Sequence, residues 1–209
     1  MSESIQIENK GAVRYITLNR PEAFNSFDRV MGRAFQEELD KAASDDSVRC
    51  IVITGEGRAF CAGMDLSVEG NVFGLDESKK PTVEDMQCEP VVEGVSDSGG
   101  QVVLAIYDCK KPVIAAVNGA AVGIGATMLA AMDIRLASEK AKIGFVFEKI
   151  GITPEACSSW FLPRIVGLSQ ALEWVYTGEI VSANEAKEKG LVRSVHQPDE
   201  LLEAAYGIA

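Results

Sequence analysis

Residues 112–131 read PVIAAVNGAAVGIGATMLAA, in which two apolar runs are joined by a turn rich in glycine. The first run, 112–117, predicts a buried strand, and the second predicts a helix. Gly119, Gly123 and Gly125 form a G-x-x-x-G-x-G pattern, which is neither the Rossmann order nor a P-loop. Such a turn can present backbone N–H groups to developing negative charge, and the helix dipole adds to that field. Alternatively, its small residues serve only to let the helix pack tightly.

The rest of the chain alternates between patterns typical of strands and patterns typical of helices. Two short β-branched runs near the N-terminus predict a hairpin, and an amphipathic helix and a nearly continuous apolar strand follow. Strands are expected at 4–7, 13–18, 48–54, 112–117, 134–137, 141–147 and 191–195, and helices at 28–43, 101–109, 128–131, 169–177, 182–189 and from about 199. This alternation predicts an α/β fold.

Composition narrows the classes of function. Twenty Lys and Arg against 31 Asp and Glu give a net charge of −11, which disfavours nucleic acid and anionic membranes as partners. A single histidine, His196, removes most His-based triads and metal sites, so we expect no metal. Five cysteines without a C-x-x-C pair favour a reducing compartment. Neither a signal peptide nor an apolar stretch of about 18 residues is evident, and we expect a cytoplasmic protein without nucleic-acid or membrane partners.

Residues 67–100 differ in composition from the sequence on either side. They contain eight acidic and two basic residues and end in Ser98-Gly99-Gly100. Such a composition predicts a solvated insertion outside the core, which could act as a lid and shape the mouth of a binding site.

Several motifs in a fixed order carry a family resemblance. They are NRPEAFN at 19–25, GRAFCAGMDL at 57–66 and KPVIAAVNG at 111–119, followed by 121–133 and 178–192. Together they resemble the enoyl-CoA hydratase/isomerase (crotonase) superfamily over nearly the whole chain. The resemblance implies a crotonase-like ββα-repeat spiral core, an acyl-CoA thioester substrate, no metal, and no cofactor beyond the coenzyme A of that substrate. It also implies a homotrimer or a dimer of trimers.

The resemblance sets the expected domain organisation. Residues 1–198 would form the core, with the variable acidic insertion at 67–100. Residues 199–209 would begin the C-terminal helical segment, which in this family usually continues for several more helices. We therefore expect that segment to be cut short here.

An oxyanion hole made of two backbone amides is the next implication of the resemblance. Carried over, its donors are the N–H groups of Met64 and Ile124, where Ile124 departs from the usual glycine but keeps the amide. Fixed backbone dipoles suit a thioester enolate, whose oxygen becomes negative in a dry site. The substrate-binding residues implied in the same way are Ala23, Ala62, Gly63, Asp65, Leu66 and Gly123. Candidate cations for the coenzyme A phosphates are Arg20, Arg58, Lys110 and Lys111.

Two positions argue against the usual hydration mechanism. Crotonase-type hydratases hold one water between two glutamates, and the matching positions here are Thr127 and Phe147. Glu148, next to the second position, is either a shifted replacement or a surface charge at the end of a strand.

Glu155 is the candidate acid/base. It stands in TPEACSSWFLP at 153–163, which resembles the segment of peroxisomal-type 3-enoyl to 2-enoyl-CoA isomerases that carries their single catalytic glutamate. Those enzymes also have Val-Gly-Ile in the glycine turn and Thr at the first hydratase position. One carboxylate suffices for an isomerase, because it can take a proton from C2 and return it at C4. Thr153 and Pro154 predict a helix start, so the alternative is that Glu155 is only a favourable acid in the first turn.

These motifs favour an enoyl-CoA isomerase with Glu155, Met64 and Ile124 as its catalytic groups. The alternatives are an enoyl-CoA hydratase or another crotonase-type reaction, and a non-catalytic acyl-CoA-binding protein of the same fold.

Overall fold

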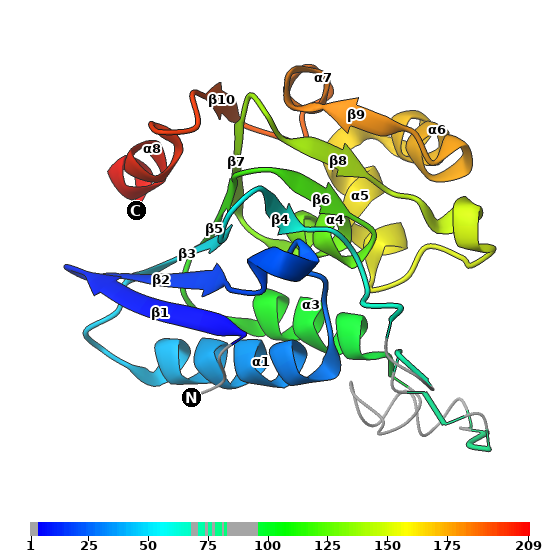
Figure 1. Ribbon diagram of the computed structural model, residues 1–209, viewed down its shortest axis with the longest axis horizontal. Helices are drawn as coiled ribbons and strands as arrows, with labels where there is room; N and C mark the ends of the chain where they lie inside the picture. Colours follow the sequence, from blue (N-terminus) through cyan, green and yellow to red (C-terminus); the bar gives the residue numbers. More distant parts are fainter. Residues whose placement is uncertain (1–3, 68–70, 74, 77, 81, 83–95) are drawn as a thin grey trace.

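The computed structural model describes residues 4–67, 71–73, 75–76, 78–80, 82 and 96–209, which form two sheets with helices packed on them (Figure 1). The larger sheet has six strands in the order β1-β2-β3-β5-β7-β10, and the smaller has four in the order β4-β6-β8-β9. Among the strand pairs described, β1–β2 and β8–β9 are antiparallel and the others are parallel. The predicted α/β class is confirmed.

The elements have the following bounds. The larger sheet consists of β1 (Ile5–Lys10), β2 (Val13–Leu18), β3 (Cys50–Gly55), β5 (Val113–Val117), β7 (Ile134–Ser138) and β10 (Ser194–His196). The smaller consists of β4 (Ala59–Cys61), β6 (Ala120–Val122), β8 (Lys142–Gly144) and β9 (Ile180–Ser182). The α-helices are α1 (Arg29–Ser44), α3 (Ser98–Asp108), α4 (Ile124–Ala131), α5 (Ser158–Val166), α6 (Leu168–Thr177), α7 (Ala183–Glu188) and α8 (Leu201–Ile208), and two 3₁₀ helices are η1 (Pro21–Ala23) and η2 (Phe147–Ile150).

The central strands of the larger sheet are each followed directly by a strand of the smaller one. β3 leads to β4, β5 to β6, and β7 to β8. The next described α-helices along the chain are α3, α4 and α5, respectively. This is the predicted ββα repeat, and it places the ends of β4 and β6 side by side at one edge of the smaller sheet.

The larger sheet is covered on both faces. Ile51 and Ile53 of β3 belong to the core that also contains the buried faces of α1 and α3, whereas Val52 packs in a second cluster with Leu201 and Ala205 of α8. Figure 1 shows α1 and α3 on one side of the sheet and α8 on the other. Because neither face meets water, β3 is apolar without the alternation of a half-exposed strand.

Helix α1 shows how local sequence sets these packing faces. It begins after Asp28, whose carboxylate accepts the N–H of Met31 at 2.7 Å and so satisfies an otherwise unpaired amide. Met31, Phe35 and Leu39 then recur every four residues and are buried. Each such side chain contributes on the order of 1.5–3 kcal/mol through burial.

The structure corrects several predicted element bounds. β4, β6 and β9 were not predicted, because three residues are too few to show a strand period. The strand predicted at 141–147 is confined to β8, since the chain turns into η2 at Phe147. Helix α3 begins at Ser98, inside the predicted insertion 67–100, where Asp97 is its N-cap. Much of that insertion lies outside the described residues.

No helix in the described part of the chain combines the length and the apolar character needed to cross a membrane.

Gly119 provides a test of how closely β4 and β6 must approach. A methyl group at this position would collide with the backbone carbonyl of Arg58, which cannot rotate away. We expect Gly119→Ala to lower the free energy of unfolding in urea by about 1–3 kcal/mol. Gly207→Ala is the matched control, because nothing lies within 4 Å of its added methyl in helix α8. That control should be neutral or stabilising by up to about 1 kcal/mol. Equal effects of the two substitutions would contradict the role given to Gly119.

Candidate active site

Two glycine loops meet at the ends of β4 and β6. Gly63 in the first loop has φ +113° and Gly123 in the second has φ +54°, values that favour glycine. A methyl group placed on Gly123 would lie 3.8 Å from the Cα of Gly63, and one placed on Gly63 would lie 3.4 Å from the carbonyl oxygen of Val122, so little more than one methyl group separates the two loops. The loops that the sequence analysis paired as an oxyanion hole are therefore adjacent.

The glycine turn serves two purposes. A methyl group on Gly125 would collide with the carbonyl of Cys61, and one on Gly119 would collide with the carbonyl of Arg58. These two glycines allow close packing, which was the plainer interpretation of the pattern. Gly123 instead provides the backbone conformation that begins α4.

Two backbone amides at this junction have no acceptor in the described part of the chain. Asp65 N–H donates to Phe27 at 2.8 Å, and Gly123 N–H donates to Gly144 at 2.9 Å. The amides next to them, those of Met64 and Ile124, donate to no described group. Ile124 is the first residue of α4, so its N–H is one that a helix leaves unsatisfied.

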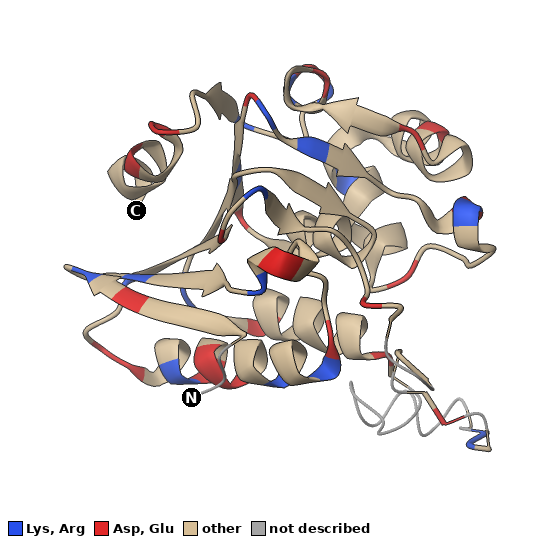
Figure 2. Cartoon of the chain, in the orientation of Figure 1, with Lys and Arg blue, Asp and Glu red and all other residues tan. Residues whose placement is uncertain are grey.

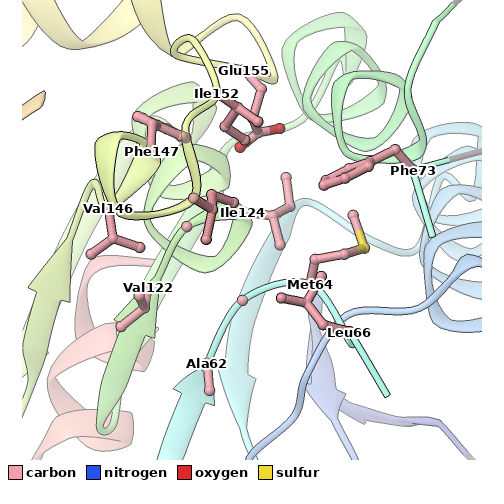
Figure 3. A pocket seen from close by; sticks show the side chains of 13 residues that line it. Ala62, Met64, Leu66, Phe73, Val122, Ile124, Val146, Phe147, Ile152 and Glu155 are labelled. Atoms are coloured by element: carbon pink, nitrogen blue, oxygen red, sulfur yellow. The ribbon is translucent and has the colours of Figure 1, made fainter. Parts of the chain in front are cut away.

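Met64 and Ile124 line one cavity, which has a volume of about 130 Å³. Its other lining residues are Ala62, Gly63, Leu66, Phe73, Val122, Gly123, Val146, Phe147, Ile150, Ile152 and Glu155. Figure 3 shows the Glu155 carboxylate directed into this cavity, across from Met64 and Leu66. Among these lining residues, Glu155 alone carries an ionisable side chain.

The segment that carries Glu155 differs from the prediction. Helix α5 begins at Ser158 rather than near Thr153, so Glu155 lies in a turn before the helix and not in its first turn. The reason is a left-handed backbone at Ala156 (φ 49°) and Cys157 (φ 57°). Such conformations cost on the order of 1–3 kcal/mol each for residues other than glycine, and they cluster at functional sites.

The pKa of Glu155 is raised to about 7. Burial is the larger cause, and the nearby charge of Asp97 adds to it. The hydroxyl of Thr127 opposes the shift, since it lies 3.2 Å from Glu155 Oε1 and donates to the carboxylate. A carboxyl with this pKa populates both its acid and its base form near neutral pH, which is what general acid/base catalysis requires.

The positions of the two hydratase glutamates hold no second carboxylate. Thr127 is buried beside Glu155, and Phe147 is buried in the cavity wall. Glu148 is exposed, and its carboxylate lies against Gly178, just after α6. A methyl group placed on Gly178 would collide with that carboxylate. Glu148 does not line the cavity, so its position favours the interpretation as a surface charge.

The implied substrate-binding residues divide into two groups. Ala62, Gly63, Leu66 and Gly123 line the cavity, whereas Ala23 and Asp65 do not. Ala23 lies in η1.

Asp65 joins the first glycine loop to the segment before α1. Its carboxylate accepts from Ser67 and from Arg20 at 2.8 Å, and these hydrogen bonds lower the pKa of Asp65 to about 2. Arg20 also pairs with Asp28 at 3.0 Å. The position of Asp65 indicates that it fixes the loop rather than contacts a ligand in the cavity.

Two of the candidate cations are engaged within the protein. Arg20 forms the ion pairs with Asp28 and Asp65, and Lys111 donates to the carbonyl of Asp45. Arg58 is exposed above the ring of Phe24, and Lys110 is also exposed. Figure 2 shows basic residues scattered over the elements in this view rather than gathered in one patch.

The described residues contain no group of three or more His, Cys, Asp or Glu side chains that could hold a metal ion.

A family model described as Enoyl-CoA hydratase/isomerase matches residues 8–209. The chain belongs to the enoyl-CoA hydratase/isomerase family. Enoyl-CoA hydratase ACTT3 of Alternaria alternata is 40% identical over 186 residues, which cover 89% of this chain and 58% of that protein. 1,2-Epoxyphenylacetyl-CoA isomerase of Escherichia coli K12 is 35% identical over 209 residues, which cover the whole chain and 76% of that protein. The chain thus spans less than two thirds of the first of these relatives.

A solved enoyl-CoA hydratase/isomerase from Pseudoalteromonas atlantica T6c superposes with a TM-score of 0.82 at 34% identity, over 99% of this chain and 75% of that structure. The predicted crotonase-like fold of this family member is confirmed. The relatives are named both as hydratases and as isomerases, so the family does not by itself distinguish the two reactions.

Sequence reasoning missed part of this family member's site. Phe73, Val146, Ile150 and Ile152 line the cavity, and no local motif identifies them. Asp97 also went unnoticed, although Asp before a helical run is a recognisable N-cap pattern.

The raised pKa of Glu155 predicts a pH-dependent stability. A carboxyl that is harder to ionise when folded stabilises the protein fully below its unfolded pKa of about 4.5, and this contribution is lost as the pH rises towards about 7. Glu155→Gln removes the ionisation. Between about pH 5 and about pH 8, the wild type should lose on the order of 2 kcal/mol of its free energy of unfolding through this ionisation, and the variant should not. Urea unfolding at both pH values measures this, and parallel pH profiles would contradict the raised pKa.

Proposed function

We propose that this chain catalyses the shift of a double bond in an enoyl-CoA thioester from position 3 to position 2. The observation that carries the proposal is that, among the described residues, Glu155 is the one ionisable side chain of an otherwise apolar cavity, at which two backbone amides have no described acceptor. The resemblance of 153–163 to peroxisomal-type isomerases supports this subtype.

The reaction begins at C2 of the substrate. The Glu155 carboxylate takes a proton from C2, and the electron pair of that C–H bond becomes part of a dienolate. Negative charge then develops on the thioester oxygen, where the N–H groups of Met64 and Ile124 donate hydrogen bonds. Preorganised donors of this kind stabilise charge most strongly in a site without water.

The second step returns the same proton. Glu155, now neutral, protonates C4, the remaining double bond lies between C2 and C3, and the thioester carbonyl re-forms. The residue must therefore act first as a base and then as an acid. A pKa near 7 serves both steps, because it makes the carboxylate more basic and leaves the protonated form able to donate.

The apolar lining favours isomerisation over hydration. Hydration requires an ordered water held by more than one polar group, and the described lining of the cavity offers one carboxylate, with Thr127 behind it. Phe147 occupies the position of the second hydratase glutamate with a ring that cannot hold water. Hydration is retained as the second candidate, because relatives of this chain are named as hydratases.

We propose that the thioester contacts the backbone at Ala62, Gly63 and Gly123, with Leu66 at the cavity wall. The coenzyme A phosphates would then meet Arg58 or Lys110, which form no described ion pair and are exposed. Coenzyme A enters as part of the substrate, and no further cofactor is required by this chemistry.

The main test follows 3-enoyl-CoA and 2-enoyl-CoA separately. Glu155→Gln keeps the shape of the side chain but cannot accept the C2 proton, so isomerisation of 3-enoyl-CoA should fall by about 10²–10⁴-fold. Glu148→Gln is the matched control, and it should leave the rate unchanged because that carboxylate points to Gly178. Product formation is read by chromatography of the thioesters.

The outcomes separate the candidate functions. Undiminished isomerisation in Glu155→Gln would contradict the proposal. Hydration of 2-enoyl-CoA that is faster than isomerisation would favour the hydratase. Binding of acyl-CoA without turnover of either substrate would favour a non-catalytic protein.

We also propose assembly as a homotrimer or a dimer of trimers. Large apolar side chains are exposed on neighbouring helices: Trp160 on α5, and Leu168, Leu172 and Tyr176 on α6. An exposed apolar surface of this kind is typical of a protein–protein contact. Light scattering should give a mass three or six times that of the chain, and Leu168→Glu should shift it towards the monomer. A monomeric mass for the wild-type chain would contradict this assembly.

A further inference from the structure

The N-terminus of α3 brings a second carboxylate close to Glu155. Asp97 is the N-cap of this helix, and its Oδ1 accepts the N–H of Gly100 at 2.7 Å. A methyl group placed on Gly99 would lie 3.1 Å from Asp97 Oδ1 and 3.2 Å from Glu155 Oε2. The two carboxylates therefore approach one another across a residue that has no side chain.

Asp97 does not line the cavity, whereas Glu155 does. Its influence on a ligand must therefore pass through Glu155. The hydrogen bond from the Gly100 N–H holds the Asp97 carboxylate at the start of α3, so its position relative to Glu155 is fixed by the helix. Two like charges in partly buried positions disfavour the ionised form of each other.

The groups that face Glu155 come from three segments. Asp97 lies before α3, the hydroxyl of Thr127 belongs to α4, and the thiol of Cys157 lies in the same turn as Glu155. Burial, Asp97 and Glu155 together raise the pKa of Cys157, so the thiol stays neutral. No cationic side chain of the described residues contributes to the shift at Glu155. Among the residues that the structure describes, Asp97 is the charge that acts on Glu155.

We propose that Asp97 is a positioning residue for the reaction, whose fixed negative charge makes the Glu155 carboxylate a stronger base than burial alone would make it. This inference rests on the proposed function, in which Glu155 moves the proton. The carbon acid at C2 is weak, and the rate of its deprotonation increases with the basicity of the acceptor.

The helix itself makes this charge necessary. The N-terminus of α3 would stabilise a nearby carboxylate through its unpaired amides and its dipole, and so would weaken Glu155 as a base. The Asp97 carboxylate accepts the N–H of Gly100 and places a negative charge at the N-terminus of α3. Gly99 is required as well, because a side chain there would lie 2.6 Å from Ile124 Cδ1 and would separate the two carboxylates.

Asp97→Asn tests the charge separately from the structure. Asparagine is as good an N-cap as aspartate, so α3 keeps its start while the charge is lost. We expect the titration midpoint of Glu155, followed by carbon-13 NMR of labelled glutamate carboxyls and assigned with Glu155→Gln, to fall by about one pH unit. The acidic limb of the kcat/KM profile should move by the same amount, and kcat on its plateau should fall about threefold to tenfold.

Two further variants bracket this result. Asp108→Asn removes an exposed charge at the other end of α3 and should leave the midpoint unchanged. Thr127→Val removes the hydrogen bond to Glu155 and should move the midpoint upwards, opposite to Asp97→Asn.

An unchanged midpoint in Asp97→Asn, or an equal fall in Asp108→Asn, would overturn the inference. If Asp97→Asn does not fold, Asp97→Ser carries the same test, since serine is also a strong N-cap. The NMR titration needs no substrate, so it reports on Asp97 even if Glu155→Gln retains isomerase activity and the proposed function fails. If Glu155→Gln loses activity but the titration midpoint of Glu155 is unchanged in Asp97→Asn, the proposed function stands and the role of Asp97 is refuted.

Discussion

The geometry of the site depends on the contact between two backbones at the ends of β4 and β6. Gly119 and Gly125 let the second ββα unit lie directly on the carbonyls of the first, and Gly63 and Gly123 turn each chain where they meet. This contact places at one cavity the amides of Met64 and Ile124, which have no acceptor among the described residues. A site made from main-chain donors needs little from its side chains, which explains why small residues dominate both loops.

The surroundings of Glu155 determine how basic its carboxylate is. The cavity wall beyond the loops is apolar, so the charge on Glu155 is costly there and its pKa is raised to about 7. Burial supplies most of that effect, and the surrounding polar groups adjust it. Thr127 donates to Oε1 and favours the ionised form, whereas the charge of Asp97 disfavours it. The basicity of Glu155 therefore depends on its own burial and on two groups, Asp97 and Thr127, that are far from it in the sequence.

Much of this arrangement could be predicted from sequence. The buried strands, the long helices and the two glycine loops carry strong local patterns, and the motif around Glu155 identified the ionisable group of the cavity. The strands β4, β6 and β9 were not found, because they are defined by pairing between distant segments and not by their own periodicity. Phe73 and Asp97 were missed for a similar reason, since only tertiary packing brings them to the site. The start of α5 was misplaced because Thr153 and Pro154 form a good local start signal, which the left-handed turn at Ala156 overrides.

That turn shows the cost of placing Glu155. Two consecutive residues other than glycine adopt left-handed conformations, the carboxyl is buried beside a like charge, and the hydroxyl of Ser158 in the next residue is buried without a described partner. Each feature lowers stability, although Ala156 and Cys157 also pack against the core. The turn leaves the Glu155 side chain directed into the cavity (Figure 3). Its Oε2 lies 3.2 Å from the position of a methyl group on Gly99. Local strain concentrated at a single carboxylate is better explained by the chemistry of that carboxylate than by the fold.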